Sequence, residues 1–120
     1  MSRVPTELSE QIVVVKGLRT AGVLFCAVPN GGRRDKREAV MLKASGTVPG
    51  VPDILIFDSP PFGDQVGTAL EMKRINGRMS NLSKAQKGWI SELEKRNWLC
   101  LVGFGAEDAL AKLRQAGYEV

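Results

Sequence analysis

The spacing of hydrophobic residues predicts four helices and four strands along this chain. A helix is expected over residues 6–22, because an apolar stripe recurs there every three or four residues: Leu8, Ile12, Val15 and Leu18. Thr6 is expected to cap its start and Gly22 to end it. Further helices are expected over residues 35–46, 83–96 and 106–117.

The strands are predicted by short runs rich in Val, Leu, Ile and Phe, bounded by glycines and prolines. They cover residues 23–28, 53–57, 65–73 and 98–104. The prolines and glycine of residues 58–64 indicate a turn, so the second and third strands are expected to pair as a hairpin. The resulting order of helix, strand, short helix, two strands, helix, strand and helix is typical of an α/β fold.

Composition narrows the class of protein. The 120 residues fit one domain spanning 1–120, and 43% hydrophobic with 25% charged residues suits a packed core beneath a solvated surface. The net charge of +4 and the pI near 9.3 favour an anionic partner such as nucleic acid. No apolar run approaches the length of a membrane span and no signal peptide is visible, so we expect a cytoplasmic protein with no membrane partner.

The absence of histidine restricts the chemistry that the chain can perform. It excludes histidine-based triads, histidine general bases and most zinc sites. A metal would need oxygen ligands, which favours Mg²⁺ or Mn²⁺. No organic cofactor is expected.

Three charged residues interrupt the apolar runs of the predicted hairpin. Asp53 opens one strand, and Glu71 and Lys73 lie in the next, two residues apart and therefore on one face. If the strands pair, Asp53 approaches Glu71, and two close carboxylates repel each other unless a cation lies between them. A divalent metal with Lys73 beside it would suit phosphate chemistry. An exposed Glu–Lys pair beside an acidic strand start has the same spacing, so spacing alone leaves both interpretations open.

The densest positive segment follows the turn residues near position 30. Asn30 and the two glycines after it could bring the backbone close to DNA, or form a simple turn. The basic side chains that follow suit contacts to phosphate groups, although Asp35 and Glu38 dilute their charge and a solvated helix face is the alternative. They are Arg33, Arg34, Lys36, Arg37 and Lys43.

The sequence "GVPD" at 50–53 precedes "EMK" at 71–73, and other short motifs surround the pair. In order, these are "PNGGRR", "LKASGTVPGVPD" and "LSKAQKGWISEL". The set, which extends over about residues 7–104, resembles the VRR-NUC branch of the PD-(D/E)xK nuclease superfamily, in particular its small stand-alone phage and bacterial members. The resemblance implies a restriction-endonuclease-like αβββαβ core, with a mixed sheet flanked by helices, and a bacterial chain that a phage could encode.

The resemblance also implies a role for each matching residue. Asp53 and Glu71 would bind the metal, and Lys73 would position or activate the attacking water. A glutamate of the first helix would complete the site. Glu10, just before the apolar "QIVVV", is the preferred assignment and Glu7 the alternative, while an ordinary polar residue near a helix start is the simpler interpretation.

Gln86 matches a further family position, on the helix after the catalytic strand. Its amide would bond a substrate phosphate or brace Lys73. A solvent-facing helix glutamine is the plainer interpretation of the same residue.

The activity implied by the resemblance is Mg²⁺- or Mn²⁺-dependent hydrolysis of DNA phosphodiester bonds by an endonuclease. The small members resemble resolvases of four-way (Holliday) junctions, and two symmetric nicks suit a homodimer acting on branched DNA. Two alternatives remain open. One is a monomeric flap or nicking nuclease that acts on other branched repair intermediates, and the other is a non-catalytic nucleic-acid-binding module of nuclease fold.

Overall fold

A four-stranded mixed sheet forms the centre of the computed structural model, which describes residues 3–29 and 35–120. The strands lie in the order β1-β2-β3-β4, with β1–β2 and β2–β3 antiparallel and β3–β4 parallel. Their bounds are Phe25–Ala27, Ile54–Ile56, Gly67–Lys73 and Trp98–Phe104. The hairpin expected from the 58–64 turn is therefore confirmed as the β2–β3 pair.

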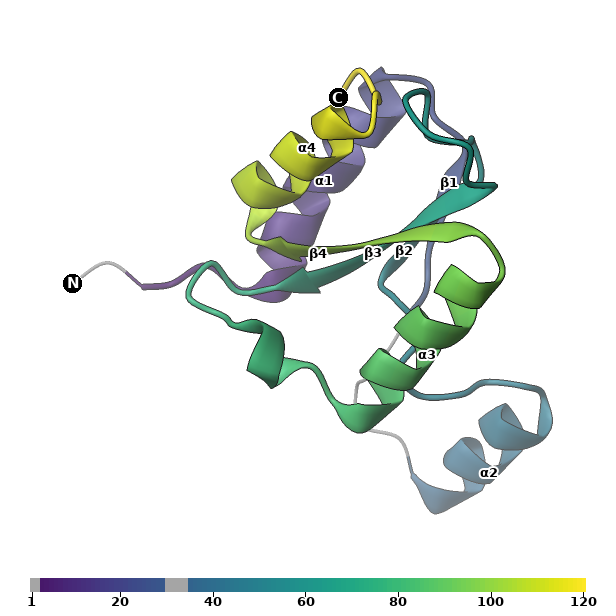
Figure 1. Ribbon diagram of the computed structural model, residues 1–120. Helices are drawn as coiled ribbons and strands as arrows, with labels where there is room; N and C mark the ends of the chain where they lie inside the picture. The colour runs from purple at the N-terminus through teal and green to yellow at the C-terminus, as the bar shows by residue number, and fades with distance from the viewer. Residues whose placement is uncertain (1–2, 30–34) are drawn as a thin grey trace.

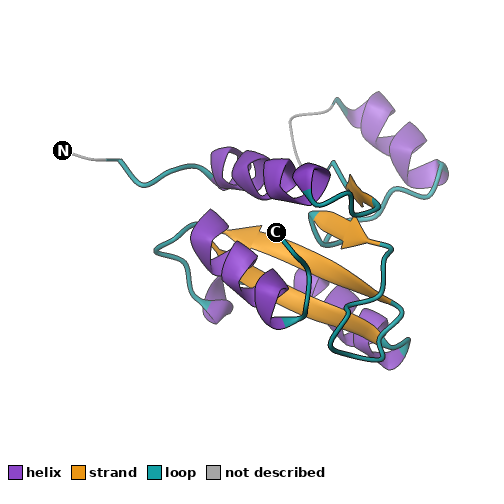
Figure 2. Ribbon diagram, turned by 90° about the horizontal axis from the view of Figure 1, so that it is seen from above, coloured by secondary structure: helices purple, strands orange, loops and turns teal. Residues whose placement is uncertain are grey.

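Helices cover both faces of this sheet (Figure 1). On one face, α1 (Glu7–Thr20) and α4 (Ala106–Gln115) lie side by side, and α3 (Lys84–Lys95) lies on the other. A short helix, η1 (Met79–Asn81), precedes α3, while α2 (Lys36–Ala44) stands apart from the sheet in both ribbon views and buries none of its residues (Figure 2). The predicted α/β fold with helices flanking a mixed sheet is confirmed.

Side-chain capping explains where the helices begin. The Thr6 hydroxyl accepts a hydrogen bond from the Ser9 N–H at 3.0 Å, as predicted, and Ser83 accepts one from the Gln86 N–H at 3.1 Å. Asp35 caps α2 in the same way. These caps satisfy backbone donors that the first turn leaves unpaired, so the helix starts are encoded locally.

The main core lies between the sheet and the α1–α4 layer. Leu70 and Met72 of β3 point into it and are fully buried, together with Val14 and Leu18 of α1. Because side chains alternate along a strand, Glu71 and Lys73 point to the opposite face, where α3 lies.

The apolar stripe predicted for α1 is partly wrong. Leu8 and Ile12 are 66% and 49% exposed, whereas the buried residues are Val14 and Leu18. Toward the start of the helix the inward side continues through half-buried Glu10, so it is acidic rather than apolar there. Hydrophobic periodicity alone cannot identify a buried helix face that carries charged residues at one end.

No helix in the described part of the chain has the length and apolar character to cross a membrane.

Candidate active site

The β2–β3 hairpin brings two carboxylates together. Ile54 lies opposite Leu70, so one step further along the same antiparallel register Asp53 lies opposite Glu71. The Asp53 carboxylate accepts a hydrogen bond from the Met72 N–H at 2.7 Å, which fixes this side chain just before the start of β2. On its other side, the Asp53 carbonyl accepts a hydrogen bond from the Val28 N–H at 2.8 Å.

Glu71 lies in a strongly perturbed environment, with only 3% of its surface exposed. Burial is the largest cause that raises its pKa to about 9, and hydrogen bonding with Asp53 and the negative charge of Asp53 raise it further. Lys73 opposes this shift, and Glu7 adds to it. Two carboxylates this close need a proton or a cation between their oxygens, because their negative charges repel each other.

Lys73 is buried beside these carboxylates and is held by the segment that follows β3. Its Nζ atom donates to the Asn81 carbonyl at 3.3 Å and to the Gln86 Oε1 atom at 3.2 Å. An ammonium group has three donors, so one N–H remains for a further acceptor.

Gln86 performs a structural task at the same time. Its Oε1 atom accepts from the Ser83 N–H at 2.8 Å, which completes a reciprocal capping box at the start of α3. Of the interpretations left open for Gln86, bracing Lys73 corresponds to the observed contact. Asn81 was not identified from the sequence, because it acts through a backbone carbonyl that any residue carries.

The two glutamates of α1 have different surroundings. A Glu10 carboxylate oxygen accepts a hydrogen bond from the Ala106 N–H, at the start of α4, where Gly105 offers no capping side chain. Glu7 instead lies close enough to Glu71 for its charge to raise the pKa of that carboxyl. The Glu10 carboxylate is thus engaged with α4, and the choice between Glu10 and Glu7 as the α1 residue of the site stays a prediction.

The loop before Asp53 is fixed against α3. Gly50 has a φ of +90°, and a Cβ there would lie 2.6 Å from the Ala85 backbone carbonyl carbon. Only glycine allows both this conformation and this close approach. The contact ties the chain entering β2 to the helix that carries Gln86.

The predicted nucleic-acid residues are only partly located. Lys36 and Arg37 are exposed at the start of α2. Asn30, Arg33 and Arg34 lie outside the described residues.

The carboxylates present fit a hard divalent cation. In the described ranges, 3–29 and 35–120, no three His, Cys, Asp or Glu residues converge closely enough to hold a metal by themselves. Mg²⁺ usually keeps several waters, however, and binds through one or two carboxylates together with substrate phosphates. Asp53 and Glu71 supply two such carboxylates, already close enough for one to raise the pKa of the other.

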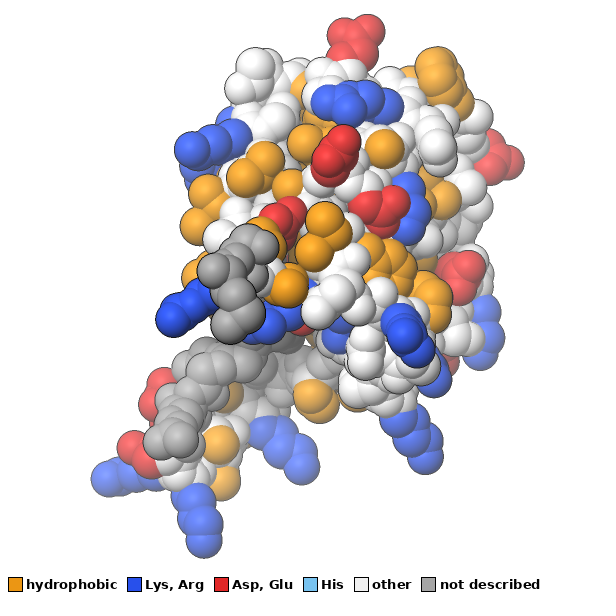
Figure 3. All heavy atoms as spheres, turned by 90° about the vertical axis from the view of Figure 1, so that its left-hand side faces the viewer, with side chains coloured by type: hydrophobic (Ala, Val, Ile, Leu, Met, Phe, Trp, Pro, Cys, Tyr) orange, Lys and Arg blue, Asp and Glu red, His pale blue; other side chains and the backbone are white. Residues whose placement is uncertain are grey.

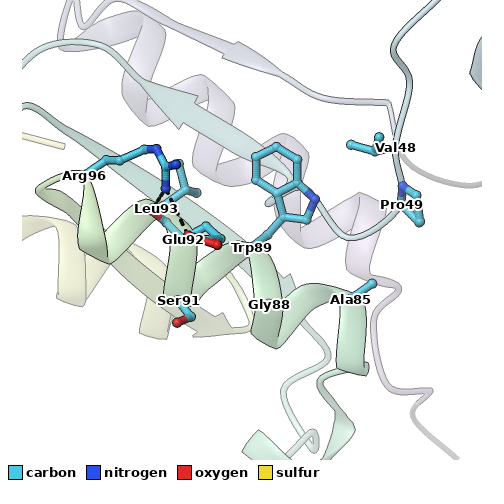
Figure 4. Close-up of a pocket in the computed structure, with 9 residues that line it drawn as sticks. All are labelled: Val48, Pro49, Ala85, Gly88, Trp89, Ser91, Glu92, Leu93 and Arg96. Carbon is cyan, nitrogen blue, oxygen red and sulfur yellow. Dashed lines mark hydrogen bonds and ion pairs between the residues drawn. The ribbon is translucent and has the colours of Figure 1, made fainter.

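A cavity of about 760 Å³ lies outside this cluster, between α3 and the 48–49 segment. Figure 4 shows the Trp89 side chain between α3 and Val48 and Pro49, with the Glu92–Arg96 ion pair further along the helix. Neither carboxylate of the hairpin lines this cavity, so it is separate from the candidate chemistry.

Comparison with solved structures identifies the fold of this chain. A solved structure named "VRR_NUC domain protein" matches with a TM-score of 0.73 over 95% of this chain and 89% of that chain. The chain has the VRR-NUC fold. The sequences are 22% identical, so the match shows the shared VRR-NUC architecture that the motifs predicted. No family model matches the sequence, and no curated protein matches it.

The VRR-NUC fold accounts for the distances in sequence between the site residues. Asp53 and Glu71 face each other across one hairpin, Lys73 ends the central strand, and Gln86 begins the crossover helix α3. The sequence motifs do not include one further signal: residues 74–87 contain four basic residues and no acidic residue.

Proposed function

We propose that this protein is a metal-dependent DNA endonuclease that hydrolyses phosphodiester bonds in branched DNA. The observation that carries the proposal is the buried Glu71 opposite Asp53, with Lys73 on the same strand face. A pure binding module gains nothing from two carboxylates that repel phosphate, whereas a metal-dependent hydrolase needs them. The VRR-NUC fold supports the same interpretation.

Each side chain of the cluster has a task in this proposal. Asp53 and Glu71 would hold Mg²⁺ or Mn²⁺, and a glutamate of α1, Glu10 or Glu7, would complete the site. When bound, the ion supplies Lewis-acid stabilisation of phosphate charge and lowers the pKa of water. Asp53 is held for this purpose by the Met72 N–H, and strand pairing holds Glu71.

Lys73 would act on the substrate through its remaining N–H. Its other two donors are occupied by Asn81 and Gln86, so the ammonium group has a defined orientation. An oriented positive charge stabilises the negative charge that develops on the phosphate as water attacks, because it needs no reorganisation during the reaction. It also positions the attacking water by hydrogen bonding.

We further propose that the substrate is a four-way junction and that the protein acts as a homodimer. A four-way junction offers two equivalent strands, and a two-fold symmetric dimer presents two equivalent sites to them. The chain folds into one such site, so paired cleavage requires two copies.

The test is cleavage of a synthetic four-way junction beside flap and linear duplex DNA, in Mg²⁺, in Mn²⁺ and in EDTA. We expect paired symmetric nicks in the junction with either metal and none in EDTA. Asp53→Asn should lower the rate roughly 100-fold or more while DNA binding is kept or strengthened, because the amide removes repulsion from phosphate.

Asp64→Asn is the matched control, since Asp64 is exposed in the loop between β2 and β3 and should cleave normally. Unchanged cleavage by Asp53→Asn, or cleavage by the wild type in EDTA, would contradict the proposed site. Cleavage of the flap DNA alone would support the metal-dependent hydrolysis but would show that the substrate is a flap and not a four-way junction. Binding without cleavage in either metal would favour the non-catalytic module.

A further inference from the structure

The segment that follows β3, residues 74–87, carries positive charge with no acidic residue to offset it. The chain contains 17 lysines and arginines and 13 acidic residues. Residues 74–87 hold four of the lysines and arginines and none of the acidic residues, so the rest of the chain has no net charge. The four basic residues are Arg74, Arg78, Lys84 and Lys87.

This segment is folded directly against the candidate active site. Lys73 donates to Asn81 and to Gln86, both of which belong to it. The Gly77 N–H donates to the Arg74 carbonyl at 2.8 Å, and this turn leads into η1 and then into the capping box of α3. The segment is therefore an ordered arm whose position is set by the same lysine that we place in the chemistry.

The four cations of the arm are exposed and free to meet an anion. They form no ion pair with any residue in the described ranges. By contrast, Lys95 and Arg96 further along α3 are both paired with Glu92. Unpaired cations on an ordered scaffold lose little conformational freedom when they bind phosphate.

Helix stability does not explain the two lysines at the start of α3. Positive charge in a first helical turn is unfavourable because the N-terminal end of the helix dipole is positive. The first turns of α1, α2 and α4 all contain acidic residues, whereas α3 begins with Lys84, has no acid in its first turn and continues with Lys87. An anionic ligand would relieve this repulsion.

Figure 3 views the end of the molecule where β3 leads into this arm. Lysine and arginine side chains project from the lower part of this face. We propose that residues 74–87 form a phosphate-binding arm that holds the DNA backbone next to the scissile bond, with Arg78 and Lys87 among its contacts. The inference rests on the proposed nuclease function and specifies how that site holds its substrate.

The test compares two double variants that remove the same charge. Arg78→Gln/Lys87→Gln alters the arm, and Lys16→Gln/Arg19→Gln alters the second half of α1, where both side chains are exposed. Binding of a fluorescently labelled four-way junction is measured by anisotropy in EDTA over a range of salt concentrations. The arm variant should raise Kd about tenfold or more and reduce the slope of log K against log salt by roughly 1.8, about 0.9 for each phosphate contact.

The control variant should keep the wild-type slope, and both variants should keep the wild-type melting temperature. Equal losses in the two variants would show that only net charge matters and would overturn the arm, as would an unchanged slope in the arm variant. Arg78→Lys/Lys87→Arg should restore binding.

Metal-dependent cleavage by the wild type is measured in parallel. If the wild type cleaves and the arm variant binds normally, the arm is wrong and the proposed function stands. If the wild type cleaves nothing, the proposed function fails, while the salt slopes still decide whether the arm binds DNA.

Discussion

At the scale of single residues, neighbouring glutamates of one helix have acquired different tasks. Glu10 caps α4 by accepting from the Ala106 N–H, and Glu7 acts electrostatically on Glu71. The two lie three residues apart, a spacing that places residues on one side of a helix, yet Glu10 is half-buried and Glu7 is exposed. The different contacts of the two glutamates therefore depend on which neighbouring element lies beside each one, and the start of α4 lies beside Glu10.

This division of tasks predicts opposite effects for two alanine substitutions. Glu7→Ala should lower metal-dependent cleavage by about tenfold or more with little change in stability, because Glu7 is exposed and makes no cap. Glu10→Ala should lower the free energy of unfolding by about 1 kcal/mol, the usual value of a lost helix cap, with a smaller effect on cleavage. Urea unfolding and junction cleavage measure the two effects. Loss of cleavage in Glu10→Ala alone would restore Glu10 to the site.

At the scale of elements, the site depends on how a loop and a helix meet. Gly50 contacts the Ala85 backbone, and Gln86, the next residue of α3, contacts Lys73. The entry to β2 and the end of β3 are therefore both fixed to the first turn of α3.

A pair of glycine substitutions tests this arrangement. Gly50→Ala should lower the free energy of unfolding by about 2 kcal/mol or more, because alanine disfavours a φ of +90° and its Cβ would overlap Ala85. Cleavage should fall as well, since Asp53 lies three residues further on. Gly88→Ala is the control: its Cβ would meet nothing within 4 Å, so alanine should stabilise α3 by up to about 1 kcal/mol. Normal stability and cleavage in Gly50→Ala would show that the loop is not fixed by α3.

Most elements could be predicted from the sequence because their signals are local. The Thr6 and Ser83 caps and the hairpin turn each depend on a few adjacent residues. The buried face of α1 could not be predicted in the same way. Half-buried Glu10 lies on it because α4, which is distant in sequence, supplies the backbone N–H that its carboxylate accepts.

At the scale of the whole molecule, the proposed junction cleavage requires two copies of the chain. Sedimentation should give a mass near twice the 13.0 kDa of one chain at micromolar concentration. Mixing wild-type chains with an excess of Asp53→Asn should convert paired cuts into single nicks, because mixed dimers hold one working site. A monomer at every concentration would contradict the dimer and leave the metal-dependent chemistry untouched.

The sequence by itself determined the order of the elements and the cluster of Asp53, Glu71 and Lys73. Strand alternation is a short-range property, so Glu71 and Lys73 must lie on one face, and antiparallel pairing of the two strands brings Asp53 opposite Glu71. Only the tertiary structure decided that Glu10 meets the start of α4, that Gln86 holds Lys73, and that residues 74–87 lie beside the site. These depend on the rotation of α1 and the packing of α3 against the sheet, which contacts between distant segments set.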